Sequence, residues 1–484
     1  MTGEGERRRH GGRPGRGDRR SRGGRRGPAR DLARTTAFDV LRAVDERDAY
    51  ANLLLPHLIR ERRLSARDAG LATELAYGTL RGMGTYDAII AACSDRPPER
   101  LDPPLLDALR IGAHQLLRTR VPAHAAVGTT VDLVRLRLGA GPSRYANAVL
   151  RKIATRSFAE WLPIVAPDPE EDAVGNLAVS HSHPRWIVSA LKDALHAAGP
   201  SPDAGKEIAA LLEADNERPK VTLVARPGRA TAEELIAAGA EPAAYSPYAA
   251  YLPDGDPAGI AAVAEGRAAV QDEASQMVAL ALTRVPVEGG DARWLDMCAG
   301  PGGKAALLDG LARERGARLI AADAQYHRAR LVWNATREAK VITADGTAPA
   351  WRPAAFDRVM LDAPCTGLGA LRRRPEARWR RDPASLPELT SLQRRLLRSA
   401  LEAVRPGGVV AYVTCSPHIA ETRVVVEDVL KDAAGDAGHE VLDARAFLPE
   451  VDDLGPGPYA QFWPHRHGTD AMFLALLRRG ASAG

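Results

Sequence analysis

Apolar positions between residues 31 and 155 recur at the spacing of helix turns. One face of the first helix carries four of them, namely Ala37, Val40, Leu41 and Val44. The same spacing returns over Leu105–Leu117 and Val127–Leu138, whereas strand-like alternation is absent. Pro97-Pro98 and Pro103-Pro104 interrupt the pattern between helices. The pattern predicts an all-helical domain over 31–155 whose apolar stripes form its core.

Residues 156–265 mix short strand and helix patterns. Val221–Ala225 predicts a strand, and Thr231–Ala238 predicts a helix that a threonine cap begins. A second strand is expected near Tyr248–Leu252. We therefore expect a small α/β domain that links the two outer domains.

Residues 266–480 alternate between two kinds of segment. Short apolar runs of the buried-strand type are Trp294–Met297, Arg318–Ala322, Arg358–Leu361 and Val409–Thr414. Helical stretches between them include Ala305–Arg315, His327–Arg337 and Leu389–Val404. This alternation predicts a Rossmann-like α/β domain with a doubly wound, mostly parallel sheet. Such sheets bind ligands at the carboxyl ends of their strands, so the chemistry is expected at that edge.

Charge is distributed unevenly along the 484 residues. The segment 1–30 holds eleven arginines against Glu4, Glu6 and Asp18, so it is strongly basic, and the rest of the chain is net acidic because the total is only +5. This Arg/Gly/Pro segment cannot bury an apolar face, which predicts a disordered tail. It is interpreted either as a non-specific ligand of RNA phosphates or as a solubilising extension. Any RNA-binding surface of the folded part must then be a local patch.

Signals of a membrane or secreted protein are missing from the sequence. No run of 18 apolar residues occurs, and the N-terminus lacks the apolar centre of a signal peptide. The four cysteines, Cys93, Cys298, Cys365 and Cys415, are too scattered for a disulfide framework. We expect a cytoplasmic, monomeric protein without a metal, whose cysteines stay free for chemistry.

A glycine-rich loop follows the first strand of the predicted sheet. Its residues are Cys298, Ala299, Gly300, Pro301, Gly302, Gly303 and Lys304. Glycines let a backbone approach a ligand closely, and the following helix offers free N–H groups, although an ordinary turn would look similar. Asp323 ends the second strand, where an acid suits ribose hydroxyls, and Asp345 follows the next strand, where an acid could reach adenine. Each aspartate alone could be a helix cap, but together they favour an adenosine-containing cofactor.

Two cysteines follow two core strands, so both thiols are expected at the same edge. A methyltransferase would need a thiol if its target were carbon 5 of cytosine, which is a poor nucleophile. A thiolate that adds to carbon 6 makes carbon 5 able to attack a methyl sulfonium. Asp362, three residues before Cys365, could stabilise the adduct at ring N3. The alternatives are that Cys365 and Cys415 are buried small side chains, or that they bind zinc with His418, which no paired CxxC spacing supports.

An arginine-rich segment follows Cys365. Six arginines and Trp379 occur between residues 372 and 381. Beside a reaction edge, this composition suits phosphate contact and base stacking, and the alternative is a solvated charged loop. The target base must be unpaired or flipped to expose its ring face.

These motifs resemble those of the RNA cytosine-5 methyltransferases of the Sun/RsmB family. Asp362-Ala-Pro-Cys365 matches their proline-cysteine motif, Thr414-Cys415 matches their threonine-cysteine motif, and the glycine-rich loop is close to theirs. The resemblance implies S-adenosylmethionine as methyl donor, Cys415 as nucleophile and Cys365 as the residue that assists product release. It also implies cofactor contacts for three acids, Asp323, Asp345 and Asp362.

The resemblance extends to the rest of the chain outside its two ends. Val270–Gln276 and Pro464–Asp470 resemble segments that open and close the family's catalytic domain. Asp68 and three helical motifs resemble the NusB-like domain of the small-subunit ribosomal RNA enzymes: Tyr77–Arg81, Leu109–Leu117 and Asn147–Arg151. The implied substrate is 16S ribosomal RNA. Gly300 stands where the family usually has alanine, and Glu421-Thr-Arg423 replaces its Glu-Asn-Glu.

Other functions stay open at this point. The same chemistry could act on another RNA, such as transfer RNA, because the helical domain points to ribosomal RNA only by analogy. A non-catalytic RNA-binding or antitermination factor is disfavoured by the intact pair of Cys365 and Cys415. A nicotinamide-dependent oxidoreductase is disfavoured by the absence of GxGxxG.

Overall fold

The computed structural model describes residues 31–199, 203–432 and 438–480. The arginine-rich segment 1–30, which we expect to be disordered, lies outside the described residues. No helix in the described part of the chain is long and apolar enough to cross a membrane.

The N-terminal domain is all-helical, as its hydrophobic spacing predicts. Its helices are α1 (Leu32–Arg47), α2 (Ala51–Glu61), α3 (Ala66–Cys93), α4 (Pro103–Arg118), α5 (Ala123–Leu138) and α6 (Ala140–Ile153). The predicted face of α1 is buried, with Ala37 and Val40 fully inaccessible to solvent. Helix α3 begins where the side chain of Ser65 accepts a hydrogen bond from the backbone N–H of Asp68.

The segment that follows is more helical than its sequence pattern indicates. Four helices come first: α7 (Phe158–Val165), α8 (Ala173–Ser180), α9 (Arg185–Ala197) and α10 (Ala204–Ala214). A small antiparallel sheet then has the order β2-β3-β1-β4, formed by β2 (Glu241–Pro242), β3 (Ala249–Leu252), β1 (Val221–Ala225) and β4 (Ala268–Val270). The predicted helix is α11 (Ala232–Ala237), and Thr231 caps it as expected.

The large sheet confirms the doubly wound, mostly parallel prediction. Its order is β10-β12-β9-β8-β5-β6-β7, and the strands from β9 to β7 are parallel. Their bounds are β5 (Arg293–Asp296), β6 (Arg318–Asp323), β7 (Lys340–Thr343), β8 (Phe356–Asp362), β9 (Val404–Thr414), β10 (Glu440–Leu442) and β12 (Phe473–Arg478). Strand β12 runs antiparallel to β9. The order reverses between β5 and β8, and ligands bind at such a switch point.

Helices cover both faces of this sheet. Consecutive strand residues point to opposite faces, so that Trp294 packs in one core and Leu295 in the other. Helices α13 (Glu273–Arg284) and α14 (Gly303–Glu314) contribute to the first core, and α15 (Tyr326–Thr336) adds Val332. Helices α17 (Leu386–Ala403) and α18 (Arg423–Asp432) contribute to the second. Burial of these apolar faces stabilises the layers.

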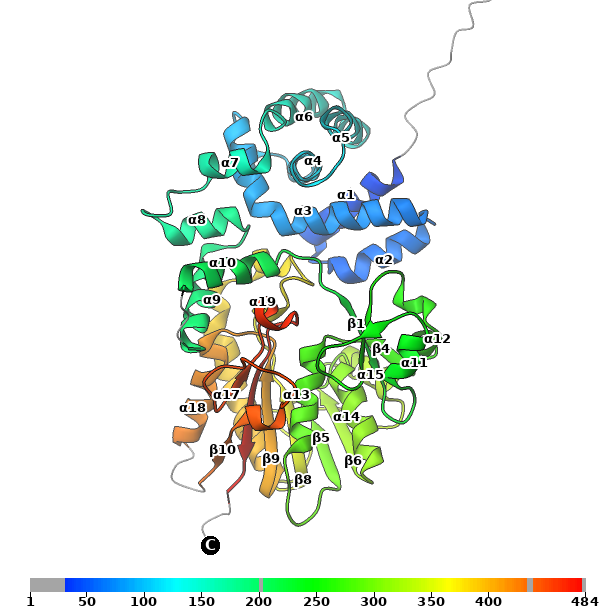
Figure 1. Ribbon diagram of the computed structural model, residues 1–484, viewed down its shortest axis with the longest axis vertical. Coiled ribbons are helices and arrows are strands. Elements are labelled where there is room, and N and C mark those ends of the chain that lie inside the picture. The colour runs from blue at the N-terminus through cyan, green and yellow to red at the C-terminus, as the bar shows by residue number, and fades with distance from the viewer. Residues whose placement is uncertain (1–30, 200–202, 433–437, 481–484) are drawn as a thin grey trace, which may run out of the picture.

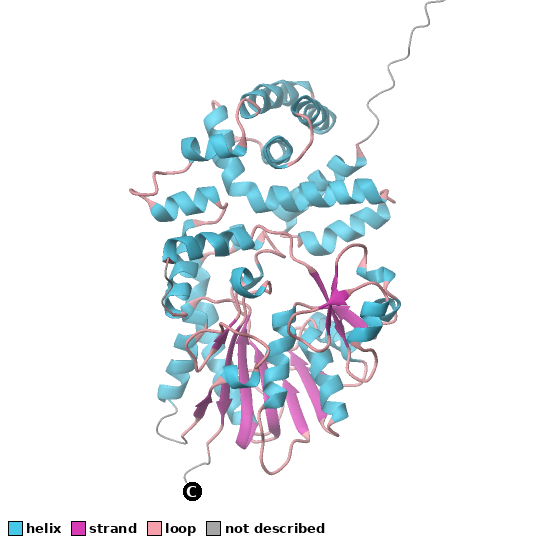
Figure 2. Ribbon diagram, in the orientation of Figure 1, coloured by secondary structure: helices cyan, strands magenta, loops and turns pink. Residues whose placement is uncertain are grey.

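The three parts are stacked in space (Figure 1). The N-terminal helices lie at one end, the large sheet lies at the other, and α9, α10 and the short helix α19 (Pro464–His467) lie between them. Figure 2 shows the small sheet as a separate unit beside one end of the large sheet. The segment that follows β8, at the carboxyl edge of the large sheet, contacts the helical domain through Arg380.

The arginine-rich segment connects these parts, which corrects its interpretation as a phosphate-binding loop. Arg378 is fully buried and donates to the carbonyl of Ser182 and to the side chain of Asn216 at 2.9 and 2.8 Å. Arg380 donates to the carbonyls that end α1, at Val44 (2.8 Å), Asp48 (3.0 Å) and Ala49 (2.7 Å). Arg372 and Arg373 pair with buried aspartates, so four of the six arginines bind the protein itself.

Candidate active site

Five polar side chains meet at the carboxyl edge of the large sheet. Each ends or closely follows a parallel strand: Asp296 (β5), Asp323 (β6), Asp345 (β7), Asp362 (β8) and Cys415 (β9). Parallel strands bring these positions to one edge although the residues are far apart in sequence. The structure thus brings together the acids and the thiol that the sequence singles out, and it adds Asp296.

The glycine-rich loop turns from β5 into α14 at this edge. Gly302 precedes the helix with φ 113°, a left-handed conformation that favours glycine, and a Cβ there would lie 2.7 Å from the Cβ of Ala335. The backbone N–H of Gly300 donates to Asp323 Oδ2 at 3.0 Å. A Cβ on Gly300 would lie 2.4 Å from that oxygen and 2.7 Å from Arg328 Nε. The absence of a side chain at Gly300 therefore allows Asp323 and Arg328 to contact the backbone of the loop.

The two outer acids differ in their exposure. Asp323 is 5% exposed and also accepts from the backbone N–H of Gln325 at 2.9 Å. Asp345 lies exposed after β7. Its Oδ1 accepts from the backbone N–H and the hydroxyl of Thr347, both at 2.8 Å, and these hydrogen bonds lower the pKa of Asp345. Asp323 is thus fixed against the loop, whereas Asp345 is exposed to solvent.

Asp296 is a buried acid that the sequence analysis did not single out. It is fully inaccessible, and neither carboxylate oxygen has a hydrogen-bond partner of ordinary geometry among the described residues. Burial, together with the nearby charge of Asp362, raises its pKa to about 8. The sequence could have pointed to Asp296, because it ends the strand that directly precedes the glycine-rich loop.

Lys304 and Asp362 form an ion pair at the centre of the edge. Lys304 Nζ donates to Asp362 Oδ2 at 2.9 Å, and their side chains are 11% and 28% exposed. Burial lowers the pKa of Lys304, but the charge and hydrogen bond of Asp362 outweigh burial, so the pKa lies above its ordinary value. Lys304 therefore supplies a permanent positive charge beside the thiols.

The Sγ atoms of Cys365 and Cys415 lie 3.4 Å apart. All four cysteines are free, and these two are only partly covered. The hydrogen bond from Cys365 lowers the pKa of Cys415, and the charge of Lys304 acts in the same direction. That shared hydrogen bond, together with burial and the charge of Glu421, raises the pKa of Cys365. The environment thus favours a thiolate at Cys415 and a thiol at Cys365.

Backbone contacts fix the two cysteine loops against each other. Gly369 donates its N–H to the carbonyl of Cys415 and accepts from the N–H of Ala471, both at 2.9 Å. A Cβ on Gly369 would lie 2.0 Å from the carbonyl oxygen of Ala471, so no larger residue fits without a backbone shift. Three segments distant in sequence therefore approach closely at this glycine.

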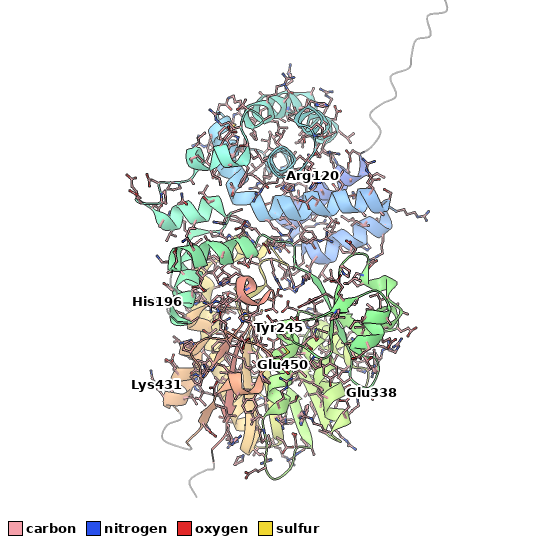
Figure 3. The ribbon with its side chains drawn as sticks, in the orientation of Figure 1. Arg120, His196, Tyr245, Glu338, Lys431 and Glu450 are labelled. Atoms are coloured by element: carbon pink, nitrogen blue, oxygen red, sulfur yellow. The ribbon has the colours of Figure 1, made fainter. Side chains whose placement is uncertain are left out.

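Two buried aspartates, Asp272 and Asp470, hold the arginine-rich segment that follows Cys365. Asp272 and Asp470 lie in the segments that open and close the catalytic domain, and the N–H of Asp470 donates to Asp272 Oδ1 at 3.1 Å. Arg372 and Arg373 each pair with both carboxylates. Near this region Tyr245, labelled in Figure 3, donates from its hydroxyl to the carbonyl of His467 at 3.4 Å, across from the small sheet.

The structure offers no zinc site at the cysteines. His418 Nδ1 accepts from the backbone N–H of Ala420 at 3.1 Å, so the ring caps its own turn. Among the described residues, no group of three or more His, Cys, Asp and Glu side chains is arranged to hold a metal ion.

This strand order, with a glycine-rich loop at the switch point and a reversed strand at the end, is a methyltransferase fold joined to a NusB-like helical domain. A family model described as 16S rRNA methyltransferase RsmB/F matches residues 282–478. A second model, the NusB family, matches residues 31–155. The solved structure of PH0851 superposes with a TM-score of 0.74 and 22% identity, covering 93% of this chain and 99% of its own, which supports the fold.

Sequence relatives match over nearly the whole chain. A Mycobacterium tuberculosis protein, named as a methyltransferase without a stated substrate, is 53% identical over 94% of this chain and 98% of its own. The ribosomal RNA small subunit methyltransferase B of Pseudomonas putida is 32% identical over 83% of this chain and 89% of its own. The chain therefore belongs to the RsmB/F family of methyltransferases. It is a methyltransferase that uses S-adenosylmethionine.

Proposed function

We propose that this protein methylates carbon 5 of a cytosine in small-subunit ribosomal RNA through a covalent intermediate on Cys415. The observation that carries the proposal is the pair of Sγ atoms, Cys365 and Cys415, 3.4 Å apart at the ligand edge of a methyltransferase fold. Transfer to an oxygen or an exocyclic nitrogen needs no thiol, because those atoms have lone pairs of their own. Carbon 5 becomes nucleophilic only after a group adds at carbon 6.

The loop and acids of the edge fit S-adenosylmethionine. The cradle consists of the seven loop residues Cys298, Ala299, Gly300, Pro301, Gly302, Gly303 and Lys304, whose glycines allow close backbone approach. Asp323 would hold the ribose hydroxyls, Asp345 would reach the adenine, and Asp362 would face the reacting end. When bound, S-adenosylmethionine supplies an electrophilic methyl group.

The chain's own residues divide the work on the cytosine. Cys415, favoured as the thiolate, forms the bond to ring carbon 6, and the ring's electron density moves toward carbon 5 and N3. Asp362 places a carboxyl group for a proton at ring N3, and Lys304 holds that carboxyl group in place at 2.9 Å. After carbon 5 is methylated, it loses its proton to a base, the double bond between carbons 5 and 6 re-forms, and Cys415 leaves as a thiolate. Cys365 assists this release of the methylated RNA.

The RNA class rests on the relatives and the domain composition. Pseudomonas putida and Bacillus subtilis relatives are named for the small ribosomal subunit. We propose that the helical residues 31–155 bind RNA, that 266–480 perform catalysis, and that 156–265 link the two. The surface that touches RNA excludes Arg378 and Arg380, which the protein's own carbonyls occupy.

The test uses RNA from cells that lack this gene. Purified protein, radiolabelled S-adenosylmethionine and that RNA are incubated, and the labelled nucleotide is mapped beside a Cys415→Ala control. We expect 5-methylcytosine at one small-subunit position, absent in the control. Label only in transfer RNA would refute the RNA class, and label that persists in Cys415→Ala would refute the nucleophile. No label despite cofactor binding would favour a binding factor.

A further inference from the structure

We propose that Glu421 is the positioning residue of the two-cysteine centre, because its buried carboxylate ties together the residues that directly follow Cys365 and Cys415. Glu421 is fully inaccessible to solvent, in the short turn after β9. The proposal rests on the proposed function for its catalytic meaning, but the geometry it describes can be tested without turnover.

Each oxygen of the carboxylate has defined donors. Oε1 accepts from the backbone N–H of Thr366 at 2.7 Å, and Oε2 accepts from the hydroxyls of Thr366 at 2.5 Å and Ser416 at 2.7 Å. Thr366 follows Cys365 and Ser416 follows Cys415. One side chain therefore holds both cysteine loops one residue away from the reacting sulfurs.

Neighbouring residues hold the carboxylate in turn. Gln393, on α17, donates to Glu421 Oε1 at 3.2 Å and to the carbonyl of Pro364 at 2.8 Å. The hydroxyl of Tyr412, on β9, donates to the backbone carbonyl of Glu421 at 2.7 Å. A buried charge with this many donors is costly to rearrange, so it defines one geometry.

The charge of Glu421 also helps to make the pKa values of the two thiols different. Glu421 contributes to the raised pKa of Cys365, whereas Lys304 contributes to the lowered pKa of Cys415. Asp362 acts on both thiols and Arg374 acts on Cys415. Burial and the charge of Glu421 raise the pKa of Tyr412 against the charge of Arg394, and burial lowers the pKa of His418 against the charge of Glu421. The charges of Glu421 and Lys304 act in the same direction as the hydrogen bond between Cys365 and Cys415, which favours a thiol at Cys365 and a thiolate at Cys415.

Two substitutions distinguish position from charge. In Glu421→Gln the amide oxygen can still accept from the N–H of Thr366, and its NH₂ can donate to the two hydroxyls, which can reverse their direction. The clamp then persists without its charge. Glu421→Ala removes both. Asp357→Asn is the matched control, because Asp357 is a buried acid at the opposite end of β8 that accepts from Arg405 at 2.6 Å and from two backbone N–H groups.

The first readout is site-specific alkylation of each cysteine by iodoacetamide, followed by peptide mass spectrometry across pH. In Glu421→Ala the two loops lose their shared carboxylate, so the hydrogen bond that lowers the pKa of Cys415 should weaken. We therefore expect alkylation of Cys415 at neutral pH to slow by about tenfold. Glu421→Gln should leave that rate near wild type but move the ionisation of Cys365 to lower pH. Asp357→Asn should match wild type at both thiols.

The second readout is turnover on the RNA substrate. We expect kcat of Glu421→Ala to fall about 100-fold with little change in KM, and Glu421→Gln to recover most of it. A folded Glu421→Ala protein with wild-type thiol chemistry would overturn the inference. If Glu421→Ala does not fold, Glu421→Asp decides, because its shorter side chain keeps the charge but cannot reach all the donors of both loops; wild-type alkylation of Cys415 in that variant would overturn the inference. Failure of the wild type to methylate RNA would instead refute the proposed function, while the alkylation result would still stand.

Discussion

Lys304 Nζ lies 2.9 Å from Asp362 Oδ2, and this ion pair stands between the glycine-rich loop and the two thiols. One residue of the pair belongs to the loop after β5 and the other ends β8, the two strands that flank the switch point. The pair thus joins the loop proposed to hold the methyl donor to the part of the site proposed to hold the cytosine. Its charges reach both.

Removal of the charge at Lys304 should change the pH dependence of the nucleophile. The positive charge lowers the pKa of Cys415, so Lys304→Met should raise that pKa and move the acidic limb of kcat/KM to higher pH. Lys304→Arg keeps the charge and should retain the wild-type limb. The pH dependence of Cys415 alkylation, measured without cofactor, checks the same shift, and identical profiles for Met and Arg variants would contradict it.

Loss of the second thiol should stop the reaction after the covalent bond has formed. We expect Cys365→Ala to accumulate a protein–RNA adduct, because Cys415 can still attack while release fails. Denaturing gel electrophoresis with labelled RNA would show the adduct as a band of reduced mobility. Cys93→Ala, which removes a buried thiol in the helical domain, is the control and should show no such band. Normal turnover by Cys365→Ala would show that the role is wrongly assigned.

The glycine at position 300 should matter more than its small size indicates. In Gly300→Ala the new Cβ would meet Asp323 Oδ2 at 2.4 Å, so Asp323 and Arg328 must move away from the loop. We expect S-adenosylmethionine binding, measured by calorimetry, to weaken by about tenfold, the equivalent of roughly 1.4 kcal/mol. Gly128→Ala in α5, where a Cβ meets nothing within 4 Å, should leave binding unchanged. Equal affinity of Gly300→Ala and wild type would show that Asp323 does not need its present position.

Asp296 should make the free protein less stable as pH rises. Its pKa is about 8 when folded and about 4 when unfolded, so the folded state holds the proton more tightly. The stability contribution is therefore complete below about pH 4 and is lost as pH rises toward 8. Asp296→Asn should therefore show a smaller fall of Tm between pH 5 and pH 8 than the wild type. Each kcal/mol of unfolding free energy corresponds to roughly 2–4 °C in Tm.

The control for this experiment is Asp345→Asn at the same edge. The pKa of Asp345 is lowered rather than raised, and the side chain is exposed, so its removal should not flatten the curve. Tm is measured by calorimetry without cofactor. A wild-type Tm that does not fall between pH 5 and pH 8 more than that of Asp296→Asn would contradict the assignment.

Parallel strands were predictable because they are buried on both faces and read as continuous apolar runs. Val409–Thr414 is such a run, and it lies within β9. Helices α7–α10 were not predicted: α7 and α8 have only eight residues each, and α9 and α10 pack against each other and against residues of the catalytic domain. Three of the four acids at the edge, Asp323, Asp345 and Asp362, were predicted because each ends or closely follows a strand and topology brings those positions together, whereas Asp296, which ends β5, was missed.

Side-chain partners far away in sequence were beyond the reach of the sequence pattern. Arg380 and its partner carbonyl at Val44 are separated by 336 positions, and nothing in the local composition distinguishes an arginine that binds phosphate from one that binds the protein's own carbonyls. The same limit applies to Glu421: the sequence shows that the two residues after it differ from the family motif, but it does not show that Thr366, Ser416 and Gln393 donate to its carboxylate. Long-range pairing had to come from the structure.

The arginine-rich segment has a consequence for how a substrate is chosen. It begins seven residues after Cys365 and ends against the first helices of the NusB-like domain, where Trp379 fills the space above Gly84. These contacts hold the helical domain in one position relative to the catalytic domain. If the helical domain binds RNA as proposed, the distance from its RNA-binding surface to the two thiols is fixed, and an RNA would be a substrate only when the distance between its bound segment and its target base matches.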